Sequence, residues 1–307
     1  MAEVLPQRHP RHTGTPLRGA VVVLTGAAGQ IGRALVDALE TAGSTVVGLD
    51  LAAACPEGDR RYVPCDITDE RAVRTTVERV VTEHGRIDVL IHCAGLSAIG
   101  AFEDHDLDVH RRVMEVTHFG AVSVTLAALP ALRAASGRVV VVGSVAGFAP
   151  VLGRPPYVAA KHAVTGLFTA LRPELEPDGV GVTLVHPTFV RGGMAEASDR
   201  AEGRERATTG EEITPADVAE AVVAAVAKGR DHVLVGRTAR RAWIVNRLAP
   251  TLYERLMKRR LRAGGGDGVT GGITDVVTGD VTGGVTGGDG VTGGDTDGDT
   301  RATGGRP

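Results

Sequence analysis

The chain has 307 residues, a formal net charge of −3 and 43% hydrophobic residues, so it can form one large α/β domain or two smaller ones. The charge gives no reason to expect nucleic acid or an anionic membrane surface as a partner. Its three cysteines lack disulfide-scaffold or metal-ligand spacing, which suits a reducing compartment, and no metal is expected. The N-terminus lacks an apolar signal core and no stretch approaches a membrane span, so we expect a cytoplasmic protein.

Apolar, strand-like runs alternate with helical patterns through residues 18–238. The expected strands lie near 20–25, 45–50, 61–65, 88–92, 138–143, 181–186 and 232–235, and the expected helices near 30–42, 69–84, 105–129, 157–176 and 214–228. This alternation predicts an α/β fold, a doubly wound parallel sheet of about seven strands with helices on both faces. No Pro/Gly-rich linker divides the stretch, so a single domain is expected.

The two ends of the chain differ from this middle part. Residues 1–17 are rich in His, Arg, Pro and Thr and are predicted to be a disordered leader. Residues 239–262 have the pattern of one basic amphipathic helix, which either packs on its own domain or a partner subunit, or associates with a membrane surface. Residues 263–307 are a low-complexity Gly/Thr/Asp tail, predicted to be disordered because it cannot bury enough apolar surface. The tail lacks the strict nine-residue period of calcium-binding repeats.

A glycine-rich turn follows the first apolar strand, and a helical pattern follows the turn. The turn contains Gly26, Gly29 and Gly32, and such a turn lets the backbone approach a pyrophosphate at a helix N-terminus. The next strand ends at Asp50, where a carboxylate can accept hydrogen bonds from an adenosine ribose. It would repel a 2′-phosphate, and no Arg or Lys follows directly, so NAD is preferred over NADP. The alternative is that Asp50 only caps its loop.

Tyr157 and Lys161 stand four residues apart, and Ser144 lies thirteen residues upstream of the tyrosine. On a helix, positions i and i+4 share a face, so the phenol and the ammonium can enter one pocket. A cation about 4 Å away, at an effective dielectric near 20, favours a phenolate by roughly 4 kcal/mol. The spacing therefore predicts a proton-transfer pair.

With these motifs in place, the chain resembles the short-chain dehydrogenase/reductase family, of the single-domain type but with an extended-type glycine spacing, over roughly residues 18–235. The landmarks occur in family order: the glycine turn, Asp66-Ile67, His92-Cys93-Ala94-Gly95, Ser144, Tyr157 with Lys161, and His186-Pro187-Thr188. The resemblance implies a Rossmann-like fold and NAD(P)-dependent interconversion of a secondary alcohol and a ketone.

The resemblance also implies roles for individual residues. Tyr157 would be the general acid/base, Lys161 would favour the phenolate and hydrogen-bond the nicotinamide ribose, and Ser144 would orient the reacting oxygen. Thr117 stands where the family usually has an asparagine that holds a water linking the lysine to solvent. The implied cofactor-binding residues are Gly26, Gly29, Gln30, Ile31, Gly32, Asp50, Asp66, Ile67, Cys93, Ala94, Gly95, Tyr157, Lys161, Pro187 and Phe189.

The sequence departs from the family pattern in four places. Thr117 offers fewer hydrogen bonds than an amide, although His118 is a candidate to rebuild the water relay. Gln30 occupies the usual position of the middle glycine, Cys93 replaces an asparagine and Thr188 replaces a glycine. These departures motivate an alternative, a catalytically weak or inactive dinucleotide-binding sensor or scaffold. An extended-type epimerase or dehydratase fits the glycines but lacks a C-terminal substrate domain.

Substrate and assembly are expectations from the same resemblance. Residues 145–153, which would line one pocket wall, are almost entirely apolar and favour a hydrophobic alcohol or ketone, unless they are simply core. Residues 189–210 would form a mobile lid. A homodimer or homotetramer is expected, with the helices near 105–129 and 157–176 pairing across a twofold axis.

Overall fold

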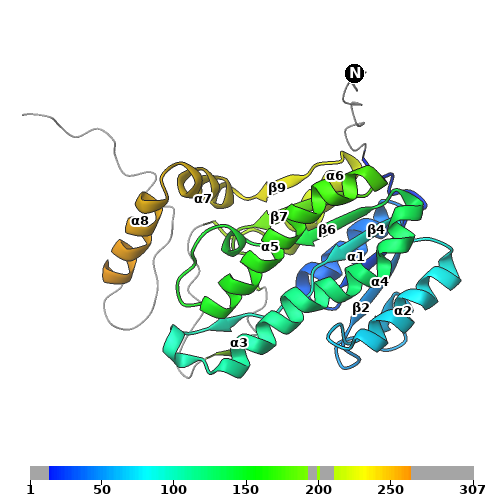
Figure 1. The fold of residues 1–307 in the computed structure, drawn as a ribbon, viewed down its shortest axis with the longest axis horizontal. Helices are drawn as coiled ribbons and strands as arrows, with labels where there is room; N and C mark the ends of the chain where they lie inside the picture. The colour runs from blue at the N-terminus through cyan, green and yellow to red at the C-terminus, as the bar shows by residue number, and fades with distance from the viewer. Residues whose placement is uncertain (1–13, 193–198, 201–210, 264–307) are drawn as a thin grey trace, which may run out of the picture.

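The computed structural model describes residues 14–192, 199–200 and 211–263. Its main sheet has seven parallel strands in the order β3-β2-β1-β4-β6-β7-β9, which confirms the predicted fold class (Figure 1). The strands are β1 (Val21–Thr25), β2 (Thr45–Asp50), β3 (Tyr62–Pro64), β4 (Val89–His92), β6 (Arg138–Val142), β7 (Gly181–Pro187) and β9 (His232–Val235). The chain order reverses between β1 and β4, and ligands of such sheets bind at the carboxyl ends of the strands beside that reversal.

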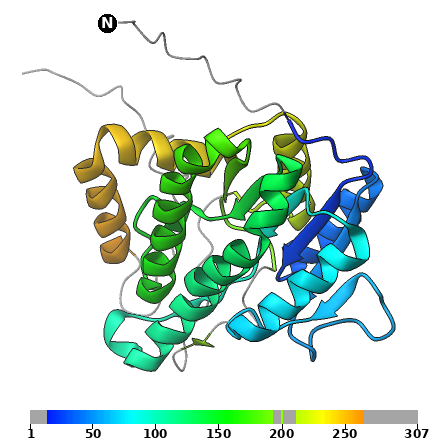
Figure 2. The same ribbon diagram turned by 45° about the vertical axis from the view of Figure 1, so that its right-hand side comes forward.

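Helices cover both faces of the sheet (Figure 1 and Figure 2). The helices α1 (Gln30–Thr41) and α6 (Pro215–Ala227) pack together on one face, and α2 (Glu70–His84), α4 (Gly120–Ala135) and α5 (Pro155–Leu175) lie on the other. Successive strand residues point to opposite faces, so Val21 and Val23 enter the core under α2, α4 and α5, whereas Val22 and Leu24 enter the core under α1 and α6. Continuous β-branched runs are therefore what this sheet requires.

The predicted helix over 105–129 is a longer run with a local irregularity. It consists of α3 (Leu107–Met114), a π-helical turn (Glu115–Phe119) and α4, which Ser136 caps at its C-terminus in a left-handed conformation. By length and composition alone, Leu107–Ala135 could span a membrane, so the expectation that no stretch approaches a span was wrong on those criteria. The inner face of α4 is buried against the sheet, however, as in any core helix.

The predicted single helix over 239–262 is two helices, α7 (Arg237–Leu248) and α8 (Pro250–Ala263), which lie at one end of the molecule (Figure 1). The break falls at Ala249, whose φ of −146° and ψ of 67° are not helical. A proline disfavours the helical conformation in the residue before it and cannot donate a backbone hydrogen bond, so Pro250 ends one helix and begins the next.

Two smaller features also differ from the expectation. A parallel pair, β5 (Ala98–Ile99) with β8 (Asp199–Arg200), was not predicted because strands of two residues leave no periodic signal. Part of the predicted leader is ordered: the Thr15 N–H donates to the Val226 carbonyl at 2.9 Å, and Leu17 is buried beside α1. The remaining leader, 1–13, and the tail from 264 lie outside the described residues.

Candidate active site

A cavity of about 1330 Å³ opens at the carboxyl ends of the strands. Ligand cavities are usually about 300–1,000 Å³, so this one has room for a dinucleotide and a small second molecule. Its walls include the predicted residues Gly26, Gly29, Gln30, Ile31, Gly32, Asp50, Asp66, Ile67, Cys93, Ala94, Gly95, Ser144, Tyr157, Lys161, Pro187 and Phe189. Thr117 is the one predicted site residue that does not line it. The fold thus brings together motifs that the sequence spreads over more than 160 residues.

The glycine turn needs glycine at two of its three positions. Gly26 has a φ of +69°, and an added Cβ would lie 2.6 Å from the Ala94 backbone. A Cβ on Gly32 would lie 2.1 Å from the Gly26 carbonyl oxygen, whereas one on Gly29 would meet that oxygen at 3.4 Å. The shifted middle glycine therefore leaves the tight part of the turn intact. The turn begins α1, whose first N–H groups have no side-chain cap and are available to a phosphate.

The Gln30 side chain lies close to Gly192, a contact that the sequence did not reveal. A Cβ on Gly192, which has a φ of +70°, would lie 2.5 Å from the Gln30 side-chain oxygen. The amide at the usual glycine position therefore reaches the loop after β7. Both residues line the cavity, so together they border the site where a pyrophosphate would lie.

Asp50 holds the glycine turn in place. One carboxylate oxygen accepts from the Ala28 N–H and the other from the Leu51 N–H, each at 2.8 Å. The loop-capping alternative is therefore observed, although a carboxylate has about four acceptor sites and retains capacity for a ribose. Sequence reasoning missed Arg33, which lines the same end of the cavity and donates to the Ala28 carbonyl at 2.7 Å. Its position in the sequence could have revealed it, since Arg33 directly follows Gly32, the last glycine of the turn.

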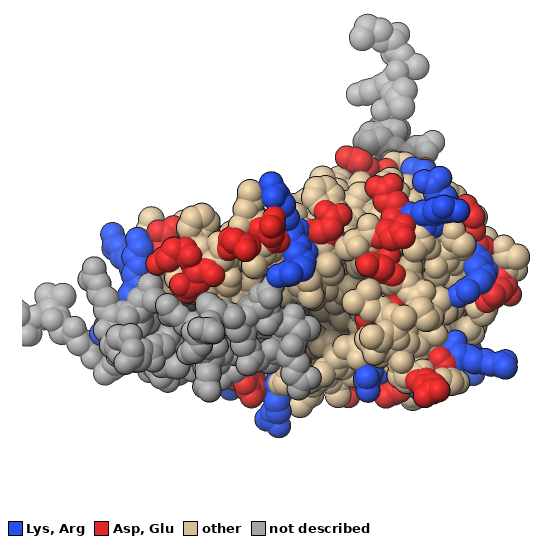
Figure 3. Space-filling view, turned by 90° about the horizontal axis from the view of Figure 1, so that it is seen from below, with Lys and Arg blue, Asp and Glu red and all other residues tan. Residues whose placement is uncertain are grey.

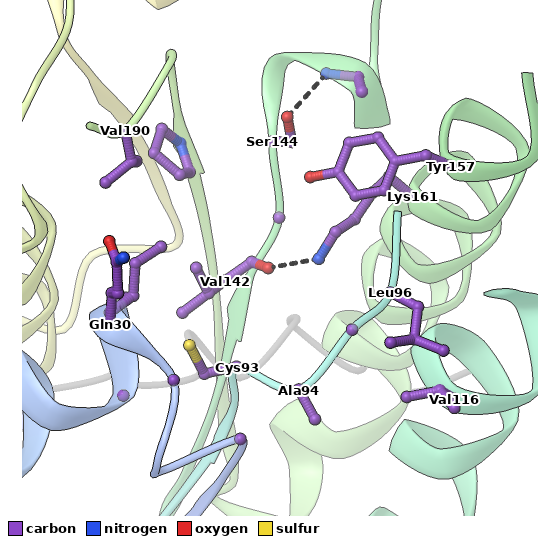
Figure 4. Close-up of a pocket in the computed structure, with 18 of the residues that line it drawn as sticks. Gln30, Cys93, Ala94, Leu96, Val116, Val142, Ser144, Tyr157, Lys161 and Val190 are labelled. Atoms are coloured by element: carbon purple, nitrogen blue, oxygen red, sulfur yellow. Dashed lines mark hydrogen bonds between the residues drawn. The ribbon is translucent and has the colours of Figure 1, made fainter. Parts of the chain in front are cut away.

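Tyr157, Lys161 and Ser144 meet at the other end of the cavity (Figure 4). Tyr157 and Lys161 are buried on one face of α5, and the Lys161 ammonium lies 5.8 Å from the centre of the tyrosine ring. Lys161 Nζ donates to the Val142 carbonyl at 2.9 Å, and Ser144 Oγ accepts from the Ala146 N–H at 3.1 Å. In Figure 4 the phenol oxygen is directed toward the serine. A hydroxyl, a phenol and an ammonium thus border one space.

Thr117 lies just behind this group, on the π-helical turn. It is only 2% exposed, and its hydroxyl accepts from the Leu96 N–H at 3.1 Å. A Cβ on Gly95 would lie 3.4 Å from Thr117 Oγ1 and 3.6 Å from Lys161 Nζ, so both atoms border the same gap. His118 instead packs its ring on Phe119, with the ring centres 4.9 Å apart, and does not line the cavity. The placement favours Thr117 over His118 as the neighbour of the lysine.

Two buried histidines support the site from behind. His92 ends β4 and pairs with the Thr125 hydroxyl at 2.8 Å; burial and the nearby Lys161 charge lower its pKa to about 3. His186 Nδ1 lies 2.9 Å from the Ser144 carbonyl oxygen, and burial lowers the His186 pKa to about 4. A carbonyl can only accept, so neutral His186 carries its proton on Nδ1 and donates it there. His186 thereby positions the backbone of Ser144.

We expect these histidines to make the protein sensitive to acid. The pKa of such a histidine is lower in the folded state than in the unfolded chain, where it is near 6.5. At a pH below 6.5 the unfolded chain binds a proton that the native state does not bind, so the free energy of unfolding falls. The loss grows by up to about 1.4 kcal/mol per pH unit down to the folded pKa. Urea unfolding gives the free energy of unfolding at pH 7 and at pH 5. Between these two pH values, this free energy should fall by about 1–2 kcal/mol less in His186→Asn than in the wild type. The exposed His84→Asn is the control; an equal loss in wild type and His186→Asn would contradict the prediction.

The rest of the cavity wall has both apolar and charged side chains. Val145, Ala146 and Val151 line it as expected, but Phe148 and Ala149 of the same segment pack against α7 and α8. Sequence reasoning missed further lining residues: Leu96, Asp108, Arg111, Arg112, Glu115, Val116, Arg154, Thr238 and Met257. No sequence signal ties Met257 to a tyrosine a hundred residues earlier. Of the predicted lid, residues 193–198 and 201–210 lie outside the described part of the chain.

A doubly wound sheet with this turn and this Ser/Tyr/Lys group defines a dinucleotide-binding oxidoreductase. A sequence model described as short chain dehydrogenase matches residues 20–203. Dehydrogenase/reductase SDR family member 7B of Bos taurus is 34% identical over 268 residues, covering 80% of this chain and 82% of the relative. The SDR family protein 7-like of Anopheles gambiae is 32% identical over 275 residues, covering 83% and 86%. The chain belongs to the short-chain dehydrogenase/reductase family, whose members are NAD(P)-binding oxidoreductases.

Solved structures agree with this assignment. A short-chain dehydrogenase from Burkholderia cenocepacia in complex with NADP has a TM-score of 0.69 and 26% identity, covering 78% of this chain and 98% of that one. A short-chain dehydrogenase from Streptomyces avermitilis has a TM-score of 0.68 and 27% identity, covering 81% and 98%.

Proposed function

We propose that this protein interconverts a secondary alcohol and a ketone on a hydrophobic small molecule, with NAD as the preferred cofactor and Tyr157 as the general acid/base. The observation that carries the proposal is the position of Tyr157, Lys161 and Ser144 in the same cavity as the glycine turn. At Gly26 and Gly32 the structure has no room for a Cβ. This suits a turn whose backbone must come close to a dinucleotide.

The side chains divide the work of an alcohol oxidation. When bound, the nicotinamide cofactor would supply the hydride chemistry. The substrate hydroxyl proton passes to Tyr157 Oη, and reduction of a ketone uses the reverse transfer. The Lys161 ammonium, 5.8 Å from the centre of the Tyr157 ring, offers a positive charge beside this transfer, and the Ser144 hydroxyl holds the reacting oxygen in line. His186 keeps the serine backbone in place.

Side chains near Tyr157 support a hydrophobic substrate. Leu96, Val145, Val151 and Met257 border the cavity there. Arg154 lies with its guanidinium carbon 5.9 Å from the centre of the Tyr157 ring, so a basic side chain also borders the pocket beside the tyrosine. A mostly apolar ketone with a polar end fits this mixture.

The test is stereospecific hydride transfer from labelled NADH to a panel of apolar ketones, with Tyr157→Phe as the control. Transfer to one face of the cofactor, lost in the variant, is the expected result. The competing hypothesis, a dinucleotide-binding sensor or scaffold, also predicts NADH binding, so binding alone does not separate the two. Equal inertness of the wild type and Tyr157→Phe over a broad panel would favour the sensor.

Asp50 and Arg33 give the cofactor preference its own test. We expect Asp50→Asn to lower the NAD/NADP affinity ratio by about 10-fold or more, because one charge-assisted hydrogen bond contributes about 1.5–3 kcal/mol. Asparagine keeps an acceptor for the Ala28 N–H, which alanine would remove. Arg33→Gln should weaken NADP more than NAD. Dissociation constants of each variant for NAD and NADP give the affinity ratio. An unchanged ratio in Asp50→Asn would mean that Asp50 caps its loop and does not bind the ribose.

We also propose a homodimer or homotetramer. Support comes from Phe119 and Leu126, which are 51% and 67% exposed on the π-helical turn and α4 within the helix expected to pair across a twofold axis. Sedimentation equilibrium of the wild type and Leu126→Lys would test it, with a monomeric variant as the expected result.

A further inference from the structure

The outer face of α7 and α8 exposes large apolar side chains. Ile244, Leu248 and Leu252 are 54%, 79% and 47% exposed. Ile244 and Leu248 stand four residues apart on α7 and form one stripe. The opposite face of α7, with Ala239 and Ala242, is buried against the domain, so the apolar stripe is not needed for the core. Exposed apolar side chains gathered on one surface indicate an interaction site.

The same two helices are strongly basic. Residues 237–263 contain nine Arg or Lys residues and one acidic residue, Glu254, although the whole chain has a net charge of −3. Glu254 lies 4.0 Å from Lys258, and the Arg247 guanidinium lies over the Trp243 ring at 5.6 Å. Figure 3 shows basic side chains at the end of the molecule where α8 lies. Of the side chains that the structure describes in these helices, the exposed basic ones are Arg237, Arg240, Arg247, Arg255, Lys258 and Arg259.

We propose that this face of α7 and α8 docks on an anionic lipid bilayer. Ile244, Leu248 and Leu252 would enter the boundary between headgroups and acyl chains, and the surrounding arginines would contact lipid phosphates. An apolar stripe on a cationic face has the chemistry of an interfacial helix, because basic residues near an anionic surface are attracted to it. A second copy of the chain would instead bring these like charges together, which opposes a self-association at this face.

The docking face is joined to the substrate segment by direct contacts. Asn246 Nδ2 donates to the Phe148 carbonyl at 2.7 Å, and the Phe148 and Trp243 rings meet edge to face with centres 4.9 Å apart. Met257 of α8 lines the cavity that holds Tyr157. A bilayer bound to α7 and α8 would therefore lie beside the substrate end of the cavity. This consequence, but not the docking itself, depends on the proposed function.

Co-sedimentation of the full chain with vesicles tests the docking. We expect binding to phosphatidylcholine vesicles that contain phosphatidylserine, weaker binding at high salt, and little binding to phosphatidylcholine alone. The double variant Leu248→Ser/Leu252→Ser should bind the anionic vesicles at least about tenfold more weakly, since it removes two apolar side chains that would be buried in the bilayer boundary. Leu107→Ser on α3, where the leucine is 61% exposed, is the matched control. Thermal melts confirm that the variants are folded.

Three results would overturn the proposal: no sedimentation with anionic vesicles, equal loss in the Leu107→Ser control, or a change in oligomeric mass in the double variant with no change in lipid binding. The last result would assign the face to a second copy. Vesicle binding needs no turnover, so its outcome is independent of the proposed reaction. If the protein binds vesicles but reduces no ketone, the proposed function fails and the docking surface stands.

Discussion

Replacing Tyr157 with phenylalanine is expected to lower kcat by about 10²–10⁴-fold, the usual contribution of a positioned general acid/base. The substitution removes one hydroxyl and leaves a ring that is 7% exposed packed in place on α5. The glycine turn and Asp50, at the far end of the cavity, remain unchanged. NADH affinity should therefore stay within about threefold of the wild type, because the lost interaction is made chiefly in the transition state.

Two measurements separate this result from a general loss of structure. A fluorescence titration gives the NADH dissociation constant, and single-turnover hydride transfer gives the chemical rate. Ser144→Ala removes a different hydroxyl from the same space and should lower the chemical rate with the same retention of cofactor. If Tyr157→Phe weakened NADH binding as strongly as it slowed the reaction, the phenol would have a binding role and not a proton-transfer role.

Gly32→Ala is expected to lower cofactor affinity by at least about 100-fold. It should also destabilise the protein without cofactor by about 1–3 kcal/mol through overpacking. The added methyl group would lie 2.1 Å from the Gly26 carbonyl and 2.6 Å from the Ala27 carbonyl, both of which are backbone atoms that cannot rotate away. The turn must open to admit it. Opening displaces the N–H groups at the start of α1 that a pyrophosphate would meet.

Gly166→Ala is the matched control, because Gly166 lies inside α5 and an added Cβ there has no atom within 4 Å. This change should stabilise the protein by about 0.4–1 kcal/mol, since alanine restricts the unfolded chain more than glycine does. Urea unfolding and NADH titration of both variants test the pair. Full NADH affinity in Gly32→Ala would show that the tight packing of the turn is not required for the cofactor.

The local motifs were predictable because their physics is local. A buried strand, a glycine turn and a helix follow one another without interruption, and the four-residue spacing of Tyr157 and Lys161 places both on one face of any helix. The alternation of strands and helices predicted the parallel sheet, and its strand ends gather Ser144, Asp50 and Cys93 around one cavity. The break at Pro250 was not predicted, although proline restricts its preceding residue and so gave a local sign of it.

Periodicity and short motifs in a known order were enough to predict the fold class, the family and the motif residues around the cavity, but not Arg33, Leu96 or Met257, which also line it. The contacts of each group became visible only in the folded structure. It placed the Asp50 carboxylate on the Ala28 N–H, His186 on the Ser144 carbonyl 42 residues away, and Met257 of α8 in the wall of the cavity. Such contacts join segments distant in the chain, and their partners are set by how helices and strands pack, which no local pattern records.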